Sequence, residues 1–294
     1  MTKDRYDSPA PWKNPEAVPV PLGALQSAAL LRGSDLRRLV RSGRALGTFL
    51  IELPTPTTLT SLAMAGFEFV VLDMEHSTIG TTVLESLIVA GHAAGLATLV
   101  RPCGRDPGLI GKILDMGAHG VMAPHVDTPE RAREIVAAAR FKPLGNRGFS
   151  PLSRFDALEH PLQALNEATY VAVQIEGRDA LRRVAEIAAV PGIDAIFVGP
   201  YDLALSLGVT PGSADLFDVA ARVAMDVPGS VSLGIYIDDP ASCGDWAARR
   251  FALQCVSFDG RMLAQGARRV AERAIAAVAG RRPTPTIGDS EGED

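Results

Sequence analysis

Residues 70–76 read VVLDMEH, three apolar residues followed by two carboxylates and an imidazole within four positions. A continuous apolar run is typical of a strand that is covered on both faces, as in a parallel sheet. The polar residues then fall at the exit of the strand, where α/β enzymes place their chemistry. Every buried strand must end in polar residues, so the ends of the other strands decide the interpretation.

The same pattern repeats along the chain. Short β-rich runs are followed by a polar or Gly/Pro turn and then by an amphipathic segment rich in Ala, Leu and Arg, which is typical of βα units. The runs are LGTFLIE (46–52), FEFVVLD (67–73), ATLVRP (97–102), GVMAPHV (120–126), TYVAVQIE (169–176), DAIFVGP (194–200), SVSLGIYI (230–237) and LQCVSFD (253–259). Eight such units close a barrel. We therefore predict an α/β protein with a (β/α)8 TIM barrel over residues 35–280.

Two ends and one insertion depart from the repeat. Prolines at 9, 11, 15, 19 and 21 favour an extended N-terminal arm, which we assign to residues 1–34. Residues 281–294 are polar and acidic and contain proline, so we expect a disordered tail. The segment 140–167 lengthens the connection between the fourth and fifth runs, and we expect it to have a function or to contact a partner.

Composition narrows the class of protein. In 294 residues, 47% are hydrophobic and 21% are charged, which is ordinary for a globular protein. No apolar stretch reaches the roughly 20 residues that span a membrane, and the first residues lack the apolar block of a signal peptide, so we predict a cytoplasmic protein. The three cysteines are far apart, which argues against disulfides and thiolate zinc sites. The net charge of −5 argues against nucleic acid as a partner. The basic cluster at 36–44 has a helical rhythm and predicts an exposed helix face.

Polar residues gather at the predicted strand exits. Because the carboxyl ends of barrel strands converge on one mouth, these residues are expected to meet although they are far apart in sequence. They are Glu52, Asp73, Glu75, His76, Arg101, His125, Gln174, Glu176 and Asp202.

Each of these side chains suggests a chemical role and also has a structural alternative. Glu176 and Asp202 are oxygen donors that suit Mg²⁺ or Mn²⁺ together with several waters. Arg101 offers a fixed positive fork for a carboxylate or an oxyanion, and His76 can move a proton near neutral pH. Taken singly, a carboxylate at a strand end also serves to cap the next helix, and Arg178 is close enough in sequence to pair with Glu176. The whole group of strand-exit residues therefore supports a functional site more strongly than any one of its members does.

An ordered series of short motifs resembles a known family. LDMEH (72–76), VRP (100–102), ILDMGA (113–118), PLGNRG (143–148), QIE (174–176) and GPYDL (199–203) occur in this order. Together they resemble the class II pyruvate aldolases of the 4-hydroxy-2-oxoheptanedioate aldolase (HpcH/HpaI) family, over roughly residues 35–280.

The resemblance implies a barrel assembled as a hexamer or trimer, with a C-terminal helix packed on a neighbouring subunit. It implies that Glu176 and Asp202 bind a divalent metal, Mg²⁺, Mn²⁺ or Co²⁺. It also implies that Arg101 contacts the keto oxygen of pyruvate and that His76 moves protons with a water. Asp73 and Asp115 match family aspartates near that histidine. We further expect Gln174, Gly199, Pro200, Tyr201 and His125 to contact substrate, with the loop 141–165 and the GNRG segment as additional candidates.

The resemblance leads to a functional prediction with alternatives. We predict a metal-dependent carbon–carbon lyase that makes a pyruvate enolate, by aldol cleavage or formation of a 4-hydroxy-2-oxo acid with an aldehyde acceptor. None of the lysines falls at a predicted strand exit, which disfavours a Schiff-base aldolase. The long arm and the phrase LIELPTPTT (50–58), with Glu52, look closer to the macrophomate synthase branch, which starts from oxaloacetate decarboxylation. A barrel without catalysis is a further alternative. A Rossmann dehydrogenase ranks low, because no G-x-G-x-x-G follows an early strand.

Overall fold

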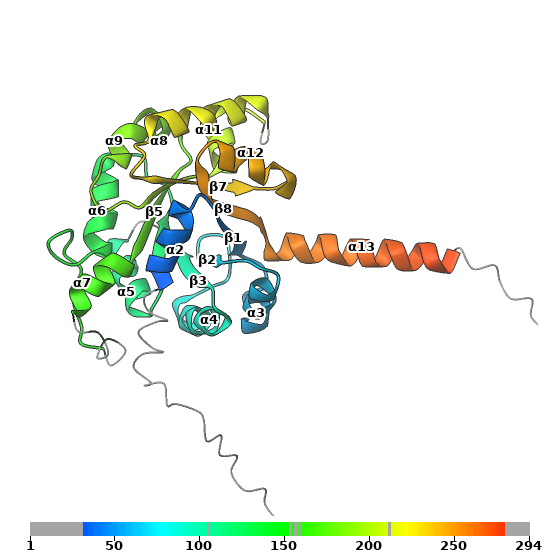
Figure 1. Ribbon diagram of the computed structural model, residues 1–294, viewed down its shortest axis with the longest axis horizontal. Helices are drawn as coiled ribbons and strands as arrows, with labels where there is room; N and C mark the ends of the chain where they lie inside the picture. Colours follow the sequence, from blue (N-terminus) through cyan, green and yellow to red (C-terminus); the bar gives the residue numbers. More distant parts are fainter. Residues whose placement is uncertain are drawn as a thin grey trace, which may run out of the picture.

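Eight parallel strands close into a barrel in sequence order, with β1 paired to β8, in a computed structural model of the chain (Figure 1). The structure describes residues 32–279 except 105, 153, 154, 156, 157, 159, 211 and 212. The strands are β1 (Ala45–Leu50), β2 (Phe69–Asp73), β3 (Ala97–Arg101), β4 (Gly120–Ala123), β5 (Tyr170–Ile175), β6 (Ala195–Val198), β7 (Ser232–Ile237) and β8 (Phe251–Phe258). The predicted (β/α)8 barrel is confirmed.

Helices surround the barrel. They are α3 (Pro56–Met64), α4 (Thr81–Ala94), α5 (Pro107–Asp115), α6 (Pro129–Ala139), α7 (Pro161–Ala168), α8 (Arg178–Arg182), α9 (Val184–Ala188), α10 (Pro200–Leu207), α11 (Ala214–Asp226), the 3₁₀ turn η2 (Pro240–Ser242) and α12 (Cys243–Ala248). Local sequence sets their starts: Thr128 caps α6 by accepting from the Arg131 amide, and Pro129 follows at the first helical position. None of the described helices is both long and apolar enough to cross a membrane.

Successive side chains of each strand point to opposite faces of the sheet, so the core has an inner part within the barrel and an outer part under the helices. Phe69 and Val71 of β2 point into the barrel, where they join one buried cluster, whereas Val70 and Leu72 join the layer between sheet and helices. Asp73 continues the inward series at the exit of β2. Arg101 does the same after Leu99, and Gln174 after Tyr170 and Ala172. Strand periodicity therefore aims three polar side chains at the mouth of the barrel.

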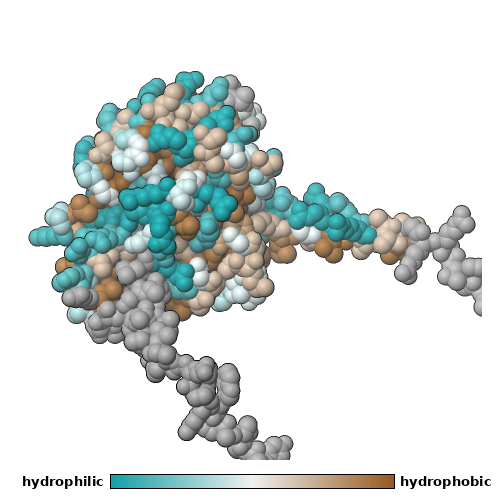
Figure 2. Space-filling model, viewed as in Figure 1, coloured by the Kyte–Doolittle hydropathy of each residue, from teal (hydrophilic) through white to brown (hydrophobic). Residues whose placement is uncertain are grey.

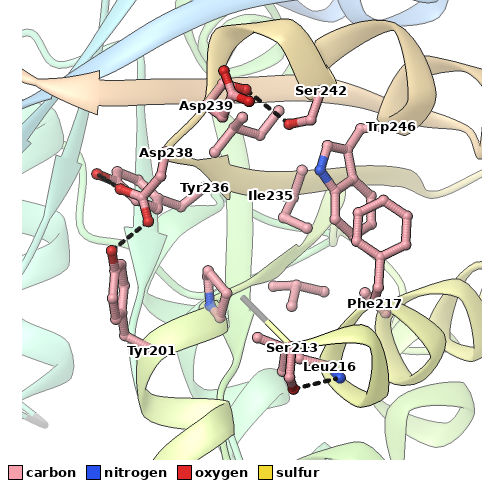
Figure 3. A pocket seen from close by; sticks show the side chains of 14 residues that line it. Tyr201, Ser213, Leu216, Phe217, Ile235, Tyr236, Asp238, Asp239, Ser242 and Trp246 are labelled. Atoms are coloured by element: carbon pink, nitrogen blue, oxygen red, sulfur yellow. Dashed lines mark hydrogen bonds between the residues drawn. The ribbon is translucent and has the colours of Figure 1, made fainter. Parts of the chain in front are cut away.

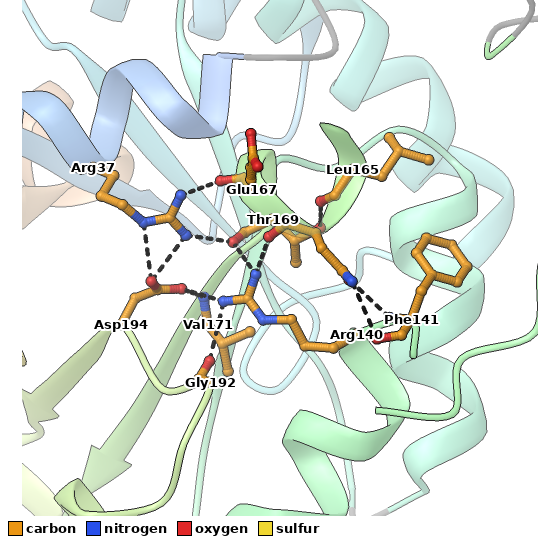
Figure 4. A network of polar contacts seen from close by, with 10 residues as sticks. Arg37, Arg140, Phe141, Leu165, Glu167, Thr169, Val171, Gly192 and Asp194 are labelled. Atoms are coloured by element: carbon orange, nitrogen blue, oxygen red, sulfur yellow. Dashed lines mark hydrogen bonds and ion pairs between the residues drawn. The ribbon is translucent and has the colours of Figure 1, made fainter. Parts of the chain in front are cut away.

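Helix α2 (Arg32–Arg41) covers the opposite end of the barrel. Its Leu36 and Val40 are buried in the inner cluster. Arg37 hydrogen-bonds Asp194 Oδ1 from Nε at 3.0 Å and from Nη2 at 2.8 Å, and Arg140 binds Asp194 Oδ2 at 2.6 Å (Figure 4). The prediction of an exposed basic face is thus wrong for Arg37, because the half-buried Asp194 and two backbone carbonyls bind its guanidinium. The helix begins at Arg32, three residues inside the predicted arm; the rest of the arm and the predicted tail lie outside the described residues.

The insertion before β5 lies away from the mouth. It leaves α6 and leads through α7 to the start of β5, so it belongs to the end where the strands begin. Its Phe149 packs against Phe141 and Phe155, with ring centroids 5.9 and 6.1 Å apart. Within one chain, none of the described residues of this loop lines the pocket at the mouth, so its expected place in the wall of the substrate pocket stays a prediction.

Helix α13 (Asp259–Ala279) extends away from the barrel (Figure 1). Its apolar residues Leu263, Val270, Ile275 and Val278 are exposed, and Figure 2 shows apolar side chains along one side of it. An exposed apolar stripe of this length is typical of an association surface.

Candidate active site

A cavity of about 260 Å³ opens at the carboxyl ends of the strands. Seven of the eleven predicted site residues line it: His76, Arg101, Gln174, Gly199, Pro200, Tyr201 and Asp202. The aromatic side chains of Phe49, Phe197, Tyr236 and Phe258 form much of the remaining wall. The strand exits therefore converge as the sequence predicts.

Arg101 is held in place by Asp73. The two residues are paired in register across β2 and β3, and Arg101 donates from Nε to Asp73 Oδ1 at 2.9 Å and from Nη2 to Oδ2 at 2.6 Å. The guanidinium also lies 3.3 Å from Glu75 Oε2 and over the Phe49 ring. Burial opposes its charge, but the hydrogen bonds and charge of Asp73, with further carboxylates, raise the pKa of Arg101 above its ordinary value. A fixed, permanently charged fork of this kind suits a substrate oxygen.

Asp73 does not orient the imidazole of His76. Its Oδ1 accepts from the backbone amides of Glu75 and His76, at 2.9 and 3.4 Å, and this shapes the turn after β2. The His76 ring lies instead 3.8 Å from Glu75 Oε2 and is largely exposed to the mouth. The expected partner is thus replaced by Glu75, because both oxygens of Asp73 are engaged by Arg101.

Glu176 lies at the exit of β5, 5% exposed. Its Oε1 accepts from the His125 amide at 2.6 Å and lies 2.9 Å from Nδ1 of the same residue. The other ring nitrogen of His125 lies 2.8 Å from Glu75 Oε1, so His125 bridges two carboxylates. Burial raises the pKa of Glu176, and the nearby charges of Glu75 and Asp202 add to the rise, against the effect of His125.

The residues around Glu176 fit a divalent cation. A Cβ on Gly199 would come within 2.9 Å of Glu176 Oε2, so this glycine leaves the room that the carboxylate occupies. The buried Gln174 Oε1 has no hydrogen-bond partner in the described part of the chain and is free to accept. Asp202 lies in the first turn of α10 and lines the cavity together with Gln174 and Gly199. Within the described ranges, no group of three or more His, Cys, Asp or Glu residues is arranged to hold a metal. Two carboxylates with waters and substrate oxygens suit Mg²⁺ or Mn²⁺.

Two further candidates lie elsewhere. Asp115 ends α5, at the far end of the barrel from the mouth, where its Oδ1 accepts from Arg147 Nη2 at 2.6 Å. The structure does not bring Asp115 to the cavity within one chain, so its catalytic role stays a prediction. Glu52 does not line the cavity either: its carboxylate fills the space over Gly260.

Several residues in or beside the cavity were given no role from the sequence. Glu75 contacts Arg101, His76 and His125, and its place in the VVLDMEH stretch was its only signal. Tyr236 projects from β7, where the alternation of the strand aims it at the barrel interior. Phe49, Phe197 and Phe258 read as ordinary core residues in sequence, because nothing local distinguishes the last inward position of a strand from those below it.

Comparisons with known proteins agree with this geometry. The chain is 33% identical over 232 residues to 2-dehydro-3,6-dideoxy-6-sulfogluconate aldolase of Pseudomonas putida, covering 76% of this chain and 90% of that protein. It is 31% identical over 248 residues to a pyruvate aldolase of Rhizobium etli, covering 82% and 97%. The crystal structure of macrophomate synthase superposes with a TM-score of 0.71 at 23% identity, covering 88% of this chain and 90% of that one, which shows a shared fold.

The two sequence relatives are aldolases, so the chain is an enzyme of the aldolase and lyase type. The family model of the HpcH/HpaI aldolase/citrate lyase family matches residues 47–260, which span all eight strands apart from the first residues of β1. The match confirms the resemblance seen in the motifs. The chain belongs to the HpcH/HpaI aldolase/citrate lyase family.

Proposed function

We propose that the protein is a divalent-metal-dependent lyase that breaks or forms a carbon–carbon bond beside a pyruvate unit, with a 4-hydroxy-2-oxo acid as the cleaved substrate. The observation that supports it most is that the clamped guanidinium of Arg101 and the carboxylate of Asp202 line one cavity. The buried Glu176 lies behind Gly199 of that cavity, close enough for the charge of Asp202 to raise its pKa. Pyruvate aldolase is also the name of a relative that covers four fifths of the chain.

Arg101 stabilises the charge that develops during the reaction. In the cleavage direction the C4 hydroxyl loses its proton, the C3–C4 bond breaks, and its electron pair forms the C2–C3 double bond of an enolate. An aldehyde leaves, and a proton added at C3 gives pyruvate. The negative charge grows on the C2 oxygen, where the guanidinium, held by Asp73, interacts with it inside a cavity walled by aromatic rings.

The metal ligands and the proton carrier are separate groups in this proposal. Glu176 and Asp202 would hold Mg²⁺, Mn²⁺ or Co²⁺, which supplies Lewis-acid stabilisation of negative oxygen when bound. Gln174 and the backbone around Gly199 and Pro200 position the carboxylate end of the substrate. His76 is exposed at the mouth beside Glu75, so it can exchange the hydroxyl proton with solvent.

A pyruvate-release assay tests the proposal. Purified protein is given 4-hydroxy-2-oxopentanoate with each of the three metals or with EDTA, and pyruvate is measured with lactate dehydrogenase. We expect metal-dependent release that is lost in Glu176→Gln; no release with any of the metals would contradict the proposal.

Oxaloacetate, assayed in parallel, tests the macrophomate-synthase-like alternative, since loss of CO₂ gives the same enolate. Glu52, which suggested that branch, faces Gly260 and not the cavity, and this favours the aldolase.

Assembly and location complete the proposal. The exposed apolar residues of α13 support a homo-oligomer, a hexamer or a trimer, in which this helix packs on a neighbouring copy. We place the enzyme in the cytoplasm.

A further inference from the structure

A second cavity of about 240 Å³ lies beside the first (Figure 3). It is enclosed by the ends of β6 and β7 and by α10, α11, η2 and α12. Pro200, Tyr201 and Tyr236 line both cavities, so one thin wall separates this space from the pocket that holds Arg101 and Asp202. Nothing in the proposed chemistry uses it.

The dividing wall is fixed by one carboxylate. Tyr201 donates a short hydrogen bond to Asp238 Oδ2, and Tyr236 donates to Oδ1 at 3.0 Å (Figure 3). Arg261, at the base of α13, forms an ion pair with the same Oδ1. The two phenol rings lie 5.8 Å apart. Because both hydroxyls are committed to Asp238, the rings stand as a firm edge between the two spaces.

The interior of the second cavity is apolar and aromatic. Phe217 and Trp246 pack with ring centroids 4.1 Å apart, and Leu216, Ala220 and Ile235 complete the wall. An engineered cavity of about 150 Å³ with a comparable lining is known to bind benzene. A space of 240 Å³ therefore has room for a phenyl ring with a short chain, or for an alkyl chain of similar bulk.

The charged groups that line this cavity are carboxylates. They are Asp238 and Asp239, and no lysine or arginine is found among the described residues that line it. A tail ending in a carboxylate, sulfonate or phosphate would meet the like charge of Asp239 here, while Arg261 lies outside the lining and is engaged by Asp238. An uncharged apolar tail packs instead against the rings and aliphatic side chains that form most of the wall.

We propose that this cavity binds the tail of the aldehyde acceptor, and that the acceptor is an uncharged aryl or alkyl aldehyde. This rests on the proposed function, because the reactive carbonyl must lie in the first cavity, beside Arg101. The acceptor then passes over the edge of Tyr201 and places its apolar end against the packed rings of Phe217 and Trp246. Burying a phenyl ring there removes apolar surface from water, which lowers KM for long apolar acceptors relative to short hydrophilic ones.

Trp246 provides a binding test that needs no catalysis. The chain has two tryptophans, Trp12 and Trp246, so Trp12→Phe leaves a single indole that lines the cavity. Titration with 3-phenylpropan-1-ol, an unreactive analogue of the acceptor, should shift its emission in a saturable way, whereas glycerol should not. An emission spectrum that does not respond to the phenyl alcohol overturns the inference.

A cavity-filling variant then tests the link to catalysis. Ala220 is buried and lines the cavity, whereas Ala221, the next residue of α11, does not, so Ala220→Leu and Ala221→Leu form a matched pair. In aldol synthesis from pyruvate, Ala220→Leu should raise the ratio of KM for 3-phenylpropanal to KM for glycolaldehyde about 10-fold. Ala221→Leu should leave this ratio as in the wild type. Equal ratios in both variants overturn the acceptor assignment.

Proton exchange at C3 of pyruvate separates this inference from the proposed function, since exchange needs no acceptor. If the pyruvate protons exchange but KM is the same for long apolar and short hydrophilic acceptors, the tail site is contradicted and the proposed lyase function stands. A Trp246 response in a protein that neither exchanges pyruvate protons nor makes aldol product contradicts the lyase, and with it the acceptor assignment.

Discussion

Asp73 and Arg101 lie opposite each other on β2 and β3 and are joined by two hydrogen bonds of 2.9 and 2.6 Å. Both side chains are inward positions at the exits of their strands, and both are almost fully buried. An arginine whose Nε and Nη2 both donate to one carboxylate keeps a single orientation. Its remaining N–H donors are then available to the cavity that it lines. The catalytic value of Arg101 therefore depends on a residue that does not line the cavity itself.

Asp73→Asn should lower kcat about 100-fold, the size of effect that follows loss of one aligned donor at a developing oxyanion. The amide keeps the shape of the aspartate but loses the charge and one acceptor that hold Arg101. The rate of pyruvate release at saturating substrate measures kcat. Asp35→Asn, which disturbs an exposed pair with Arg38, is the control and should keep full activity. An Asp73→Asn enzyme as fast as the control would contradict the positioning role.

Gly199→Ala should weaken Mn²⁺ binding at least 10-fold. The new methyl group would lie 2.9 Å from Glu176 Oε2 and 3.2 Å from its Cβ, so the carboxylate must move. Isothermal titration calorimetry gives the affinity directly. Gly80→Ala is the matched control, because a Cβ there meets nothing within 4 Å. Unchanged affinity in Gly199→Ala would show that the position of Glu176 is not set by this glycine.

The metal-free protein should lose stability through Glu176 as pH rises. A carboxyl group whose pKa is higher in the folded than in the unfolded state stabilises the fold only while that group is protonated. This contribution is complete below the ordinary value of 4.5 and is lost as pH rises through the raised value. Glu176→Gln carries no such charge, so in EDTA its Tm should exceed that of the wild type by a margin that grows from pH 4.5 to pH 8. A margin independent of pH would contradict the raised pKa.

Asp194→Asn should destabilise the fold by about 3 kcal/mol, because it leaves Arg37 and Arg140 without their shared carboxylate. The network lies at the end of the barrel remote from the cavity, so kcat of the folded fraction should be unchanged. Urea unfolding measures the free energy. The control Glu130→Gln removes an exposed pair with Arg133 and should leave the urea midpoint unchanged. Equal midpoints for the two variants would show that the network around Asp194 contributes little to the free energy of unfolding.

Strand order and the meeting of the strand exits could be predicted because they follow from period and topology. An apolar run ending in polar residues marks the exit of a parallel strand, and eight such runs leave one closed arrangement. His76, Arg101, Gln174 and Asp202 could therefore be assigned to one cavity from positions far apart in the chain.

Pairing within the cluster could not be predicted in the same way. Asp73 was expected beside the His76 ring and binds Arg101, because the register of β2 with β3 decides which neighbours touch. Asp115 occurs in a matching motif, but helix α5 carries it to the far end of the barrel. The second cavity depends on how α11 and α12 pack against β7, which no short motif records.

The central claim is that Glu176 and Asp202 hold a divalent cation that, with Arg101, stabilises the enolate of pyruvate. Exchange of the C3 protons of pyruvate in D₂O, followed by proton NMR, measures enolate formation directly. We predict exchange with Mg²⁺ or Mn²⁺ that stops on addition of EDTA and is at least 100-fold slower in Glu176→Gln and Asp202→Asn. Exchange that persists in EDTA, or that proceeds at the wild-type rate in both variants, would contradict the account.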